Sequence, residues 1–434
     1  MRTATKLAGV AVMAVTALAL SACSSSGSPQ PAKTTAAPNS VSLRMTTWTA
    51  NPDQLALFNK IADAYKQTHP EIKSITFDSL PFADYTSTLT TQIAGGSAPD
   101  LAWVLDTDAT DFVRSGALAP LTDSLKATKG YDYGDISASA AKLWTNDGKL
   151  YAYPFSTSPF VVFANDSLLK QAGEPTSAEL QSQGKWDLKD IADVASQVNA
   201  KTGQGGLIVN NFNYNDWTLL STLWNAWGAA PWSADGTKCT FTSSEMNDAF
   251  TYINKAIFDQ MAIPGPGTNL NFFSGGSAFV ITQISSANLL PAAGFEWNML
   301  PLPGLKPGAS NHVIGQAGLS VLAKGKHAQE AEDFLAYFTD PSNAKKLAEY
   351  FPPPRTSLLN ASTLAATNPV LSKQQLNDVV IPSIKDAVTR PGHVDQTQIA
   401  SQVKTALTPM WQPNAEVSSI LKKVCSSVQS SLAG

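Results

Sequence analysis

Cysteine and histidine are scarce in this chain, which has 3 cysteines and 4 histidines among 434 residues. No two histidines stand three or four positions apart, and neither a His-Glu-x-x-His nor a Cys-x-x-Cys spacing occurs. A zinc site therefore has no support from the sequence. The Gly-x-Ser-x-Gly elbow of serine hydrolases and the phosphate loop ending in Gly-Lys-Ser/Thr are missing as well. We expect no metal, no cofactor and no catalytic residue, although a glycosidase needs only two carboxylates that can lie far apart in sequence.

Charge is also low, since charged residues make up 15% of the sequence and the formal net charge is −4, from 30 Lys+Arg against 34 Asp+Glu. Residues 1–22 hold two basic residues and no acidic one, so the remainder has 28 basic against 34 acidic residues, a net charge of −6. This balance excludes a nucleic-acid partner, whose binding rests on neutralising phosphates. The 43% of hydrophobic residues exclude a disordered chain. Ten tryptophans beside so little charge favour a neutral, polar partner.

No apolar run is long enough to span a bilayer as a helix. The run 7–20 has 14 residues and follows Arg2 and Lys6, an arrangement typical of a signal peptide. Leu20-Ser21-Ala22-Cys23 then resembles the bacterial lipobox, whose cysteine is lipidated and becomes the mature N-terminus. The alternative is an ordinary secretory signal with a chance cysteine.

Two expectations follow for the N-terminal region. Residues 1–22 are predicted to be a lipoprotein signal peptide, and 23–40, rich in Ser, Pro, Thr and Ala, a flexible tether. The protein is then extracytoplasmic and anchored to the cell membrane through lipid on Cys23 alone.

The two remaining cysteines are Cys239 and Cys425. An even pair in an oxidising compartment permits a disulfide, and we predict one here. The alternative is two separate buried thiols, because free cysteine is among the most buried residue types. No histidine lies near either cysteine in sequence, so neither is expected to be catalytic.

Strand and helix patterns alternate along the chain. Alternating apolar residues predict a strand over 41–48, and the stripe that begins at Pro52 predicts a helix. A strand over 72–77, a helix over 85–93 and an apolar strand over 101–105 follow. This β-α-β-α-β order predicts an α/β fold with a parallel sheet, and about 400 residues predict two lobes. Further segments repeat the pattern, with strands over 207–209, 278–281 and 318–322 and helices over 217–227, 328–338 and 341–350.

Polar and aromatic residues gather where the predicted strands end. In open parallel sheets the ligand crevice lies beyond the carboxyl ends of the strands. Such residues suit a hydroxyl-rich ligand, because flat rings cover its C–H faces while amides and carboxylates bond its hydroxyls. The candidates are Trp48, Asp106, Asp108, Asn211, Asn213, Tyr214, Trp217 and Gln283.

Each candidate also has a structural interpretation. One of Asp106 and Asp108 is expected to cap the following helix. Trp217 follows an Asn-rich loop, which favours ligand contact over the core, whereas Trp48 suits either role equally. Trp224 and Trp227 lie in mid-helix among leucines, which favours core packing.

Several segments, in order, resemble the extracellular solute-binding proteins of sugar-importing ABC transporters, the type related to maltose-binding protein. The resemblance extends from residue 41 to the C-terminus. The segments that carry it are GGSAPDLAWV (95–104), SGALAPL (115–121), GKLYAYPFSTSPFVVFANDSLLKQAG (148–173), KWDLKDIADVA (185–195), FFSGGSAFVI (272–281) and HAQEAEDFLAYFTDPSNAKKLAE (327–349). Gly315-Gln316-Ala317-Gly318 departs from the usual Gly-Gly-x-Gly, so the family role of the second glycine does not carry over.

The resemblance implies a two-lobed periplasmic-binding-protein fold, in which each lobe is a mostly parallel sheet flanked by helices. Hinge strands would join an N-lobe of 41–153 and 301–349 to a C-lobe of 154–300 and 350–434. It adds Phe155 and Thr157, just past the first hinge, as ligand-contact candidates. It also adds His393, for which a surface loop is an equal alternative.

The function implied is that of a high-affinity carbohydrate receptor, a monomer that closes on its ligand and delivers it to the permease of an ABC importer. Two alternatives stay open. One is a secreted, lipid-anchored carbohydrate-active hydrolase, and the other is the same fold binding a polyol or a glycerophosphodiester.

Overall fold

The structure is a computed structural model that describes residues 37–309, 311–367, 370–385 and 387–432. The predicted signal peptide, Cys23 and most of the predicted tether lie outside these residues. Within them, no helix is both long and apolar enough to cross a membrane.

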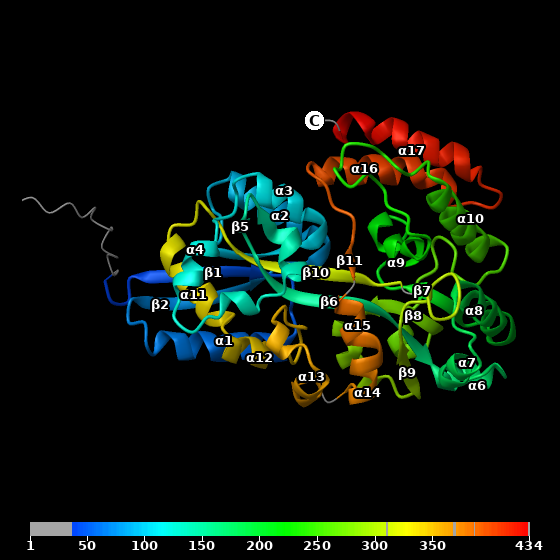
Figure 1. The fold of residues 1–434 in the computed structure, drawn as a ribbon, viewed down its shortest axis with the longest axis horizontal. Coiled ribbons are helices and arrows are strands. Elements are labelled where there is room, and N and C mark those ends of the chain that lie inside the picture. Colours follow the sequence, from blue (N-terminus) through cyan, green and yellow to red (C-terminus); the bar gives the residue numbers. More distant parts are fainter. Residues whose placement is uncertain (1–36, 310, 368–369, 386, 433–434) are drawn as a thin grey trace, which may run out of the picture. The chain divides into compact units, whose positions relative to one another are not determined.

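Over the described residues, the main sheet has nine strands (Figure 1). Its order is β2-β1-β3-β10-β6-β8-β7, with β11 beside β10 and β9 beside β6. Pairing is parallel for β1 with β2 and β3, for β7 with β8 and for β10 with β11, and antiparallel where β10 and β6 join the rest. The strands are β1 (Val41–Thr47), β2 (Ile72–Ser79), β3 (Leu101–Leu105), β6 (Tyr153–Asn165), β7 (Gly205–Val209), β8 (Ser277–Gln283), β9 (Trp297–Leu300), β10 (Val313–Val321) and β11 (Val388–Thr389), and β4 (Thr145–Asn146) pairs with β5 (Lys149–Leu150) in a separate hairpin.

Strand β6 connects the two halves of this sheet. Its 13 residues are all buried. The first part, up to Pro159, pairs with β10, and the part from Phe160 onward pairs with β8 and β9. The long β6 and β10 therefore bring the parallel strands of the two halves into one sheet.

Helices cover the sheet (Figure 1). Local chemistry sets several of their ends: the Asn51 side chain accepts from the Asp53 and Gln54 amides at the start of α1, and Gly203 ends α8 in the left-handed conformation. The helices are α1 (Pro52–Lys66), α2 (Tyr85–Ala94), α3 (Ala109–Arg114), α4 (Thr122–Ala127), α5 (Ala138–Ala141), α6 (Asp166–Gln171), α7 (Ser177–Ser182), α8 (Leu188–Thr202), α9 (Ser221–Trp224), α10 (Ser244–Phe258), α11 (Ala328–Phe338), α12 (Pro341–Leu347), α13 (Ala361–Thr367), α14 (Lys373–Gln375), α15 (Ile381–Lys385), α16 (Gln396–Leu407) and α17 (Val417–Leu432).

Successive residues of β6 face two different hydrophobic cores, as the two-residue period of a strand requires. Val162 and Ala164 pack into a cluster with helices α8, α10, α16 and α17. Val161 and Phe163 pack on the other face, with residues of α13 and α15. Burial on both faces explains why β6 is apolar over its second half.

The predicted α/β class is confirmed, and so are the predicted strands and helices up to residue 105, within two or three residues at their ends. The predicted 217–227 helix is a short α9 between two 3₁₀ turns, Trp217–Leu220 and Asn225–Trp227. The segment before β10 packs with the β7-β8 half through three described residues. Leu302 and Val313 belong to the cluster that includes Trp217, and Asn311 donates to the Thr222 and Pro303 carbonyls.

Candidate functional site

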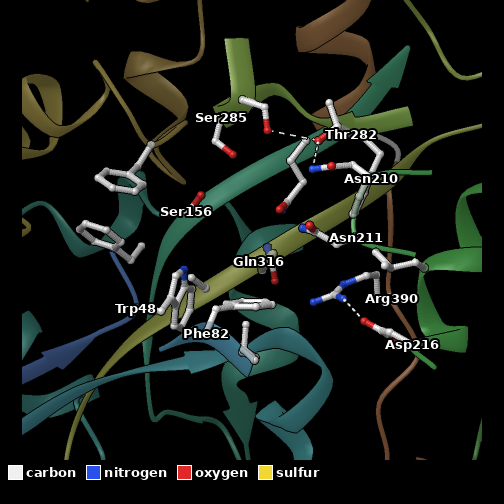
Figure 2. A pocket seen from close by; sticks show the side chains of 18 residues that line it. Trp48, Phe82, Ser156, Asn210, Asn211, Asp216, Thr282, Ser285, Gln316 and Arg390 are labelled. Carbon is white, nitrogen blue, oxygen red and sulfur yellow. Dashed lines mark hydrogen bonds and ion pairs between the residues drawn. The ribbon is translucent and has the colours of Figure 1, made fainter. Parts of the chain in front are cut away.

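A cavity that is partly open to solvent lies between the two halves of the sheet (Figure 2). Strands β6 and β10 contribute Phe155, Ser156, Phe160, Gln316 and Ala317 to its lining. Most of the other lining residues follow strands, as the strand-end rule requires. They are Trp48 after β1, Phe82 after β2, Leu105 at the end of β3, Asn210, Asn211, Asp216 and Leu219 after β7, Thr282, Gln283, Ser285 and Ser286 at and after β8, Phe351 after α12, and Arg390 after β11.

Aromatic rings form one wall of the cavity (Figure 2). Trp48 is held edge-on by Tyr85, with ring centroids 5.0 Å apart, and by Trp103 at 4.7 Å. Phe82 contacts Trp48 at 6.0 Å and is itself 50% exposed. A large ring left half in water beside a cavity offers apolar surface to a ligand.

Uncharged polar side chains form the opposite wall (Figure 2). Asn210 donates to the Thr282 hydroxyl at 3.1 Å, and that hydroxyl also contacts Ser286 at 3.2 Å. Within the described chain, the side-chain amides of Asn211 and Gln283 have no hydrogen-bond partner. These amides offer donors and acceptors together, which suits a ligand rich in hydroxyls.

The absence of a side chain at Gly315 makes room for Gln283. A Cβ on Gly315 of β10 would lie 2.0 Å from the Gln283 side-chain nitrogen. Glycine at position 315 therefore lets that amide reach the cavity past the neighbouring strand.

One ion pair borders the cavity. The Arg390 guanidinium contacts the Asp106 carboxylate through two N–H groups, with Nη2 2.5 Å from Oδ1 and Nε 3.2 Å from Oδ2. Its Nη1 lies 3.7 Å from Oδ2 of Asp216. Burial acts to lower the pKa of Arg390, but the carboxylates of Asp106, Asp216 and Asp108 outweigh it and raise that pKa above its ordinary value.

Asp108 is half-buried beside this pair and accepts a hydrogen bond from the Thr86 hydroxyl at 2.7 Å. Burial raises the pKa of Asp108 to about 6, against the bond from Thr86, and the nearby Asp106 carboxylate adds to the rise. Neither Asp106 nor Asp108 caps helix α3 through its side chain, so the expected capping role does not hold.

The raised pKa of Asp108 predicts a pH-dependent stability difference. A carboxyl group with a raised folded-state pKa favours folding below pH 3.8 and loses that contribution as the pH rises toward 6. The Asn side chain of Asp108→Asn cannot ionise. At pH 7.5 the free energy of unfolding of this variant should therefore exceed that of the wild type by about 1–3 kcal/mol. Urea titrations at pH 7.5 and 4.0 test this: the difference should shrink toward zero at pH 4.0, and an equal difference at both values would contradict it.

Four of the predicted ligand contacts line the cavity: Trp48, Phe155, Asn211 and Gln283. Asp106 stands directly behind it, fully buried and bound to the lining Arg390. Asp108 is not among the lining residues.

The ring of Trp217 does not reach the cavity, which corrects the prediction. It is 2% exposed, stacks with Trp224 at 6.1 Å and donates from its indole N–H to the Ala400 carbonyl. The Asp216 side chain caps the 3₁₀ turn by accepting a hydrogen bond from the Thr218 amide. As a result, Asp216 faces the cavity and Trp217 faces the core.

The other predicted contacts are also engaged away from the cavity. Thr157 is buried and donates to the Pro352 carbonyl at 2.9 Å, and exposed Asn213 accepts from the Asn215 amide. The Tyr214 hydroxyl donates to the Pro264 carbonyl. His393 contacts the Gly236 carbonyl at 2.9 Å, so the region around 390–393 reaches the cavity through Arg390 instead.

Sequence reasoning missed Phe82, Phe351 and Arg390, which line the cavity. Phe82 obeys the same strand-end rule as Trp48, so that rule could have found it. Phe351 precedes the Pro352–Pro354 run and Arg390 stands three residues before His393, and neither has a local signal that separates it from a packing residue.

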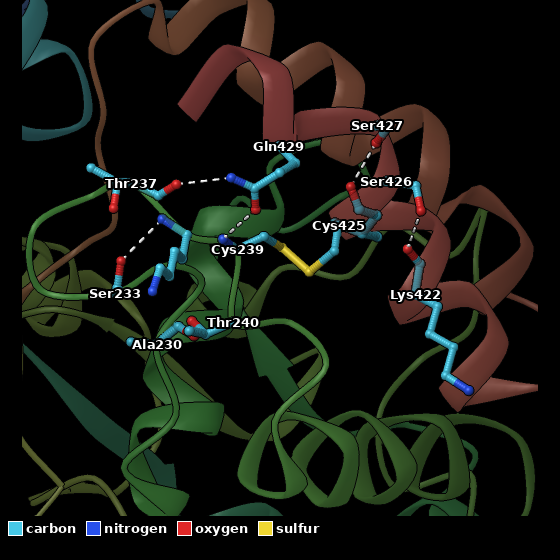
Figure 3. Close-up of a disulfide and its surroundings, with 12 residues drawn as sticks. Ala230, Ser233, Thr237, Cys239, Thr240, Lys422, Cys425, Ser426, Ser427 and Gln429 are labelled. Carbon is cyan, nitrogen blue, oxygen red and sulfur yellow. Dashed lines mark hydrogen bonds between the residues drawn. A yellow bond between two sulfur atoms is a disulfide. The ribbon is translucent and has the colours of Figure 1, made fainter. Parts of the chain in front are cut away.

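The predicted disulfide between Cys239 and Cys425 is confirmed (Figure 3). It joins the turn 233–240 to helix α17. Gln429 of the same helix accepts from the Cys239 amide and donates to the Thr237 carbonyl, so three links tie the turn to α17. Among the described residues no group of three or more His, Cys, Asp or Glu side chains is placed to hold a metal ion.

Known proteins resemble this chain over most of its length. Residues 60–370 match the family described as bacterial extracellular solute-binding protein. The lactose-binding protein of Rhizobium radiobacter is 25% identical over 309 residues, which cover 67% of this chain and 69% of that protein. The sn-glycerol-3-phosphate-binding periplasmic protein UgpB of Salmonella paratyphi A is 23% identical over 392 residues, which cover 81% of this chain and 84% of that protein.

The fold has close counterparts among solved structures. The ABC substrate-binding protein of Listeria monocytogenes in complex with cycloalternan aligns with a TM-score of 0.76 at 19% identity, covering 90% of this chain and 98% of that one. The predicted two-lobed fold class is thereby confirmed.

Proposed function

The chain belongs to the family of bacterial extracellular solute-binding proteins, and from this premise we propose that it is a receptor for a neutral sugar or oligosaccharide. The protein closes on this ligand and delivers it to the permease of an ABC importer. Its likeness to a lactose-binding protein and to a cycloalternan-bound protein supports this assignment.

The observation that carries the proposal is the pairing of the two cavity walls. Trp48 and Phe82 offer rings on one side, and Asn211 and Gln283 offer unpaired amides on the other. Stacking removes the C–H faces of a sugar from water, while amides bond its hydroxyls in place of water. The cavity is partly open to solvent, so a ligand can enter between these walls.

The hydrolase alternative has weaker support. A glycosidase places two carboxyl groups beside the bond that it cleaves. Among the described residues that line the cavity, Asp216 is the one carboxylate, and Asp106 behind it is bound to Arg390. The same residues therefore favour binding without turnover.

Anchoring and lobe boundaries are part of the proposal. We propose that lipid on Cys23 holds a monomer at the outer face of the cell membrane, which intact mass measurement of the membrane fraction tests. The contacts of Leu302, Asn311 and Val313 favour assigning 301–313 to the C-lobe, so that the N-lobe comprises 41–153 and 314–349. Residues 154–313 and 350–434 then form the C-lobe.

A thermal-shift screen over neutral mono- and oligosaccharides tests the proposed function. A ligand that binds only the native state stabilises it by mass action, and the melting temperature rises. At a ligand concentration of 100 times the Kd, the gain in stability is about 2.7 kcal/mol. At least one neutral carbohydrate should do so. A screen in which none shifts the melting temperature, while an anionic ligand does, would refute the proposal.

Trp48→Ala should weaken binding of the identified sugar about 30- to 150-fold. A stacked sugar ring hides roughly 100 Å² of apolar surface, counting both partners, which at ~25 cal/mol per Å² is about 2–3 kcal/mol. Calorimetric titration measures the loss. Trp227→Ala is the matched control, because Trp227 is also half-buried, packs on Tyr252 and lies outside the cavity lining. Equal affinity losses in both variants would contradict a stacking role for Trp48.

A further inference from the structure

We propose that Asp106 determines the specificity of this site because it pairs with the Arg390 guanidinium and neutralises its charge. The site then selects neutral ligands and rejects phosphate-bearing ones. The inference rests on the proposed function and names its ligand class more narrowly. It concerns the choice between a sugar or polyol and a glycerophosphate.

Arg390 is the group that would bind a phosphate. Of the described residues lining the cavity, it alone carries a positive charge. Phosphate recognition by arginine uses two parallel N–H donors on one edge of the guanidinium. In this structure Nε and Nη2, which make up one such edge, both point at Asp106, and Nη1 lies near Asp216.

Contacts with the surrounding backbone hold this ion pair in place. Asp106 is fully buried, and its carboxylate also accepts from the Thr107 amide at 3.0 Å and the Gln316 amide at 3.1 Å. A Cβ on Gly392 would lie 2.6 Å from the Thr107 carbonyl, so the segment bearing Arg390 packs directly against the one bearing Asp106. If Arg390 turned toward a ligand, it would leave a buried carboxylate without its counter-charge, which is strongly unfavourable.

The local charge balance acts in the same direction. One guanidinium faces the carboxylates of Asp106 and Asp216, which gives a formal local charge of −1 before Asp108 is counted. An anionic ligand therefore meets net repulsion in a partly enclosed site, whereas a neutral polyhydroxyl ligand does not. The Asn211 and Gln283 amides serve the neutral ligand equally well.

Parallel titrations of the wild-type protein with neutral probes and with sn-glycerol 3-phosphate test the inference. The neutral probes are lactose, maltotetraose and D-mannitol. The best neutral probe should bind on the order of 100-fold more tightly than sn-glycerol 3-phosphate at low salt. Asp106→Asn, which releases Arg390 from the ion pair, should reduce the ratio of the two affinities by at least about 10-fold.

Asp216→Asn is the matched control variant. It removes the same charge, but Asp216 is 45% exposed in its side chain and lies 3.7 Å from Arg390, without the two-donor contact. It should narrow the ratio less than Asp106→Asn does. An equal or larger narrowing in Asp216→Asn would overturn the role given to Asp106.

Failure of the inference differs from failure of the proposed function. If a neutral probe binds and sn-glycerol 3-phosphate binds as tightly, only the inference falls. If sn-glycerol 3-phosphate binds and no neutral probe does, the proposed function falls as well. Should Asp106→Asn not fold, the wild-type ratio alone still decides between these outcomes.

Discussion

Loss of the Cys239–Cys425 disulfide is expected to lower the free energy of unfolding by about 3–5 kcal/mol. The bridge closes a loop over a sequence separation of 186 residues. In the chain-entropy model, a loop of this length restricts the unfolded chain by about 5 kcal/mol, although measured values are often lower. The two hydrogen bonds of Gln429 to the same turn would remain in the reduced protein.

Urea denaturation of the double variant Cys239→Ala/Cys425→Ala measures the effect. Its midpoint should fall, and wild-type protein unfolded with a reductant present should behave like the variant. An unchanged midpoint in both would mean that the turn 233–240 is held to α17 without the bridge.

Arg355→Met is expected to cost about 3–5 kcal/mol of stability. Arg355 is fully buried and donates to the backbone carbonyls of Tyr131 and Thr339, each at 2.9 Å, and of Asp132 at 3.1 Å. Its guanidinium lies 3.7 Å from the Asp135 carboxylate. Removing the guanidinium takes donors from the buried Tyr131 and Thr339 carbonyls and the counter-charge from the nearly buried Asp135 carboxylate, which costs more than the side-chain bonds themselves contribute.

The matched control is Arg44→Met. Arg44 pairs with Asp78 at 3.1 Å, but both side chains are about 40% exposed, and such pairs contribute less than about 1 kcal/mol. Thermal and urea unfolding of both variants should give a large loss only for Arg355→Met. If both variants lose the same small amount, Arg355 does not hold the segment after the Pro run to the Tyr131 region.

Much of the fold was predictable because it depends on short-range patterns. Asn51 before Pro52 marked the start of a helix, and the apolar run at 101–105 marked a strand covered on both sides. The strand-end rule then placed Trp48, Asn211 and Gln283 at the cavity, since it needs only the strands and their direction.

The remaining site residues depend on loop geometry that no periodic pattern encodes. Asp216 and Trp217 are neighbours, yet the capping bond of Asp216 turns one to the cavity and the other to the core. Arg390 and His393 stand three residues apart in a loop whose path follows from the contact of Gly392 with Thr107. Distant parts of the chain therefore decide which of these side chains meets a ligand.

Recovery of the bound ligand tests the central claim most directly. The purified protein is titrated with the best neutral carbohydrate by calorimetry, then denatured, and the released ligand is analysed by mass spectrometry. A receptor predicts one ligand per protein and an unchanged mass of the carbohydrate after prolonged incubation. Release of hydrolysed products, or failure of every neutral carbohydrate to bind while sn-glycerol 3-phosphate binds, would contradict it.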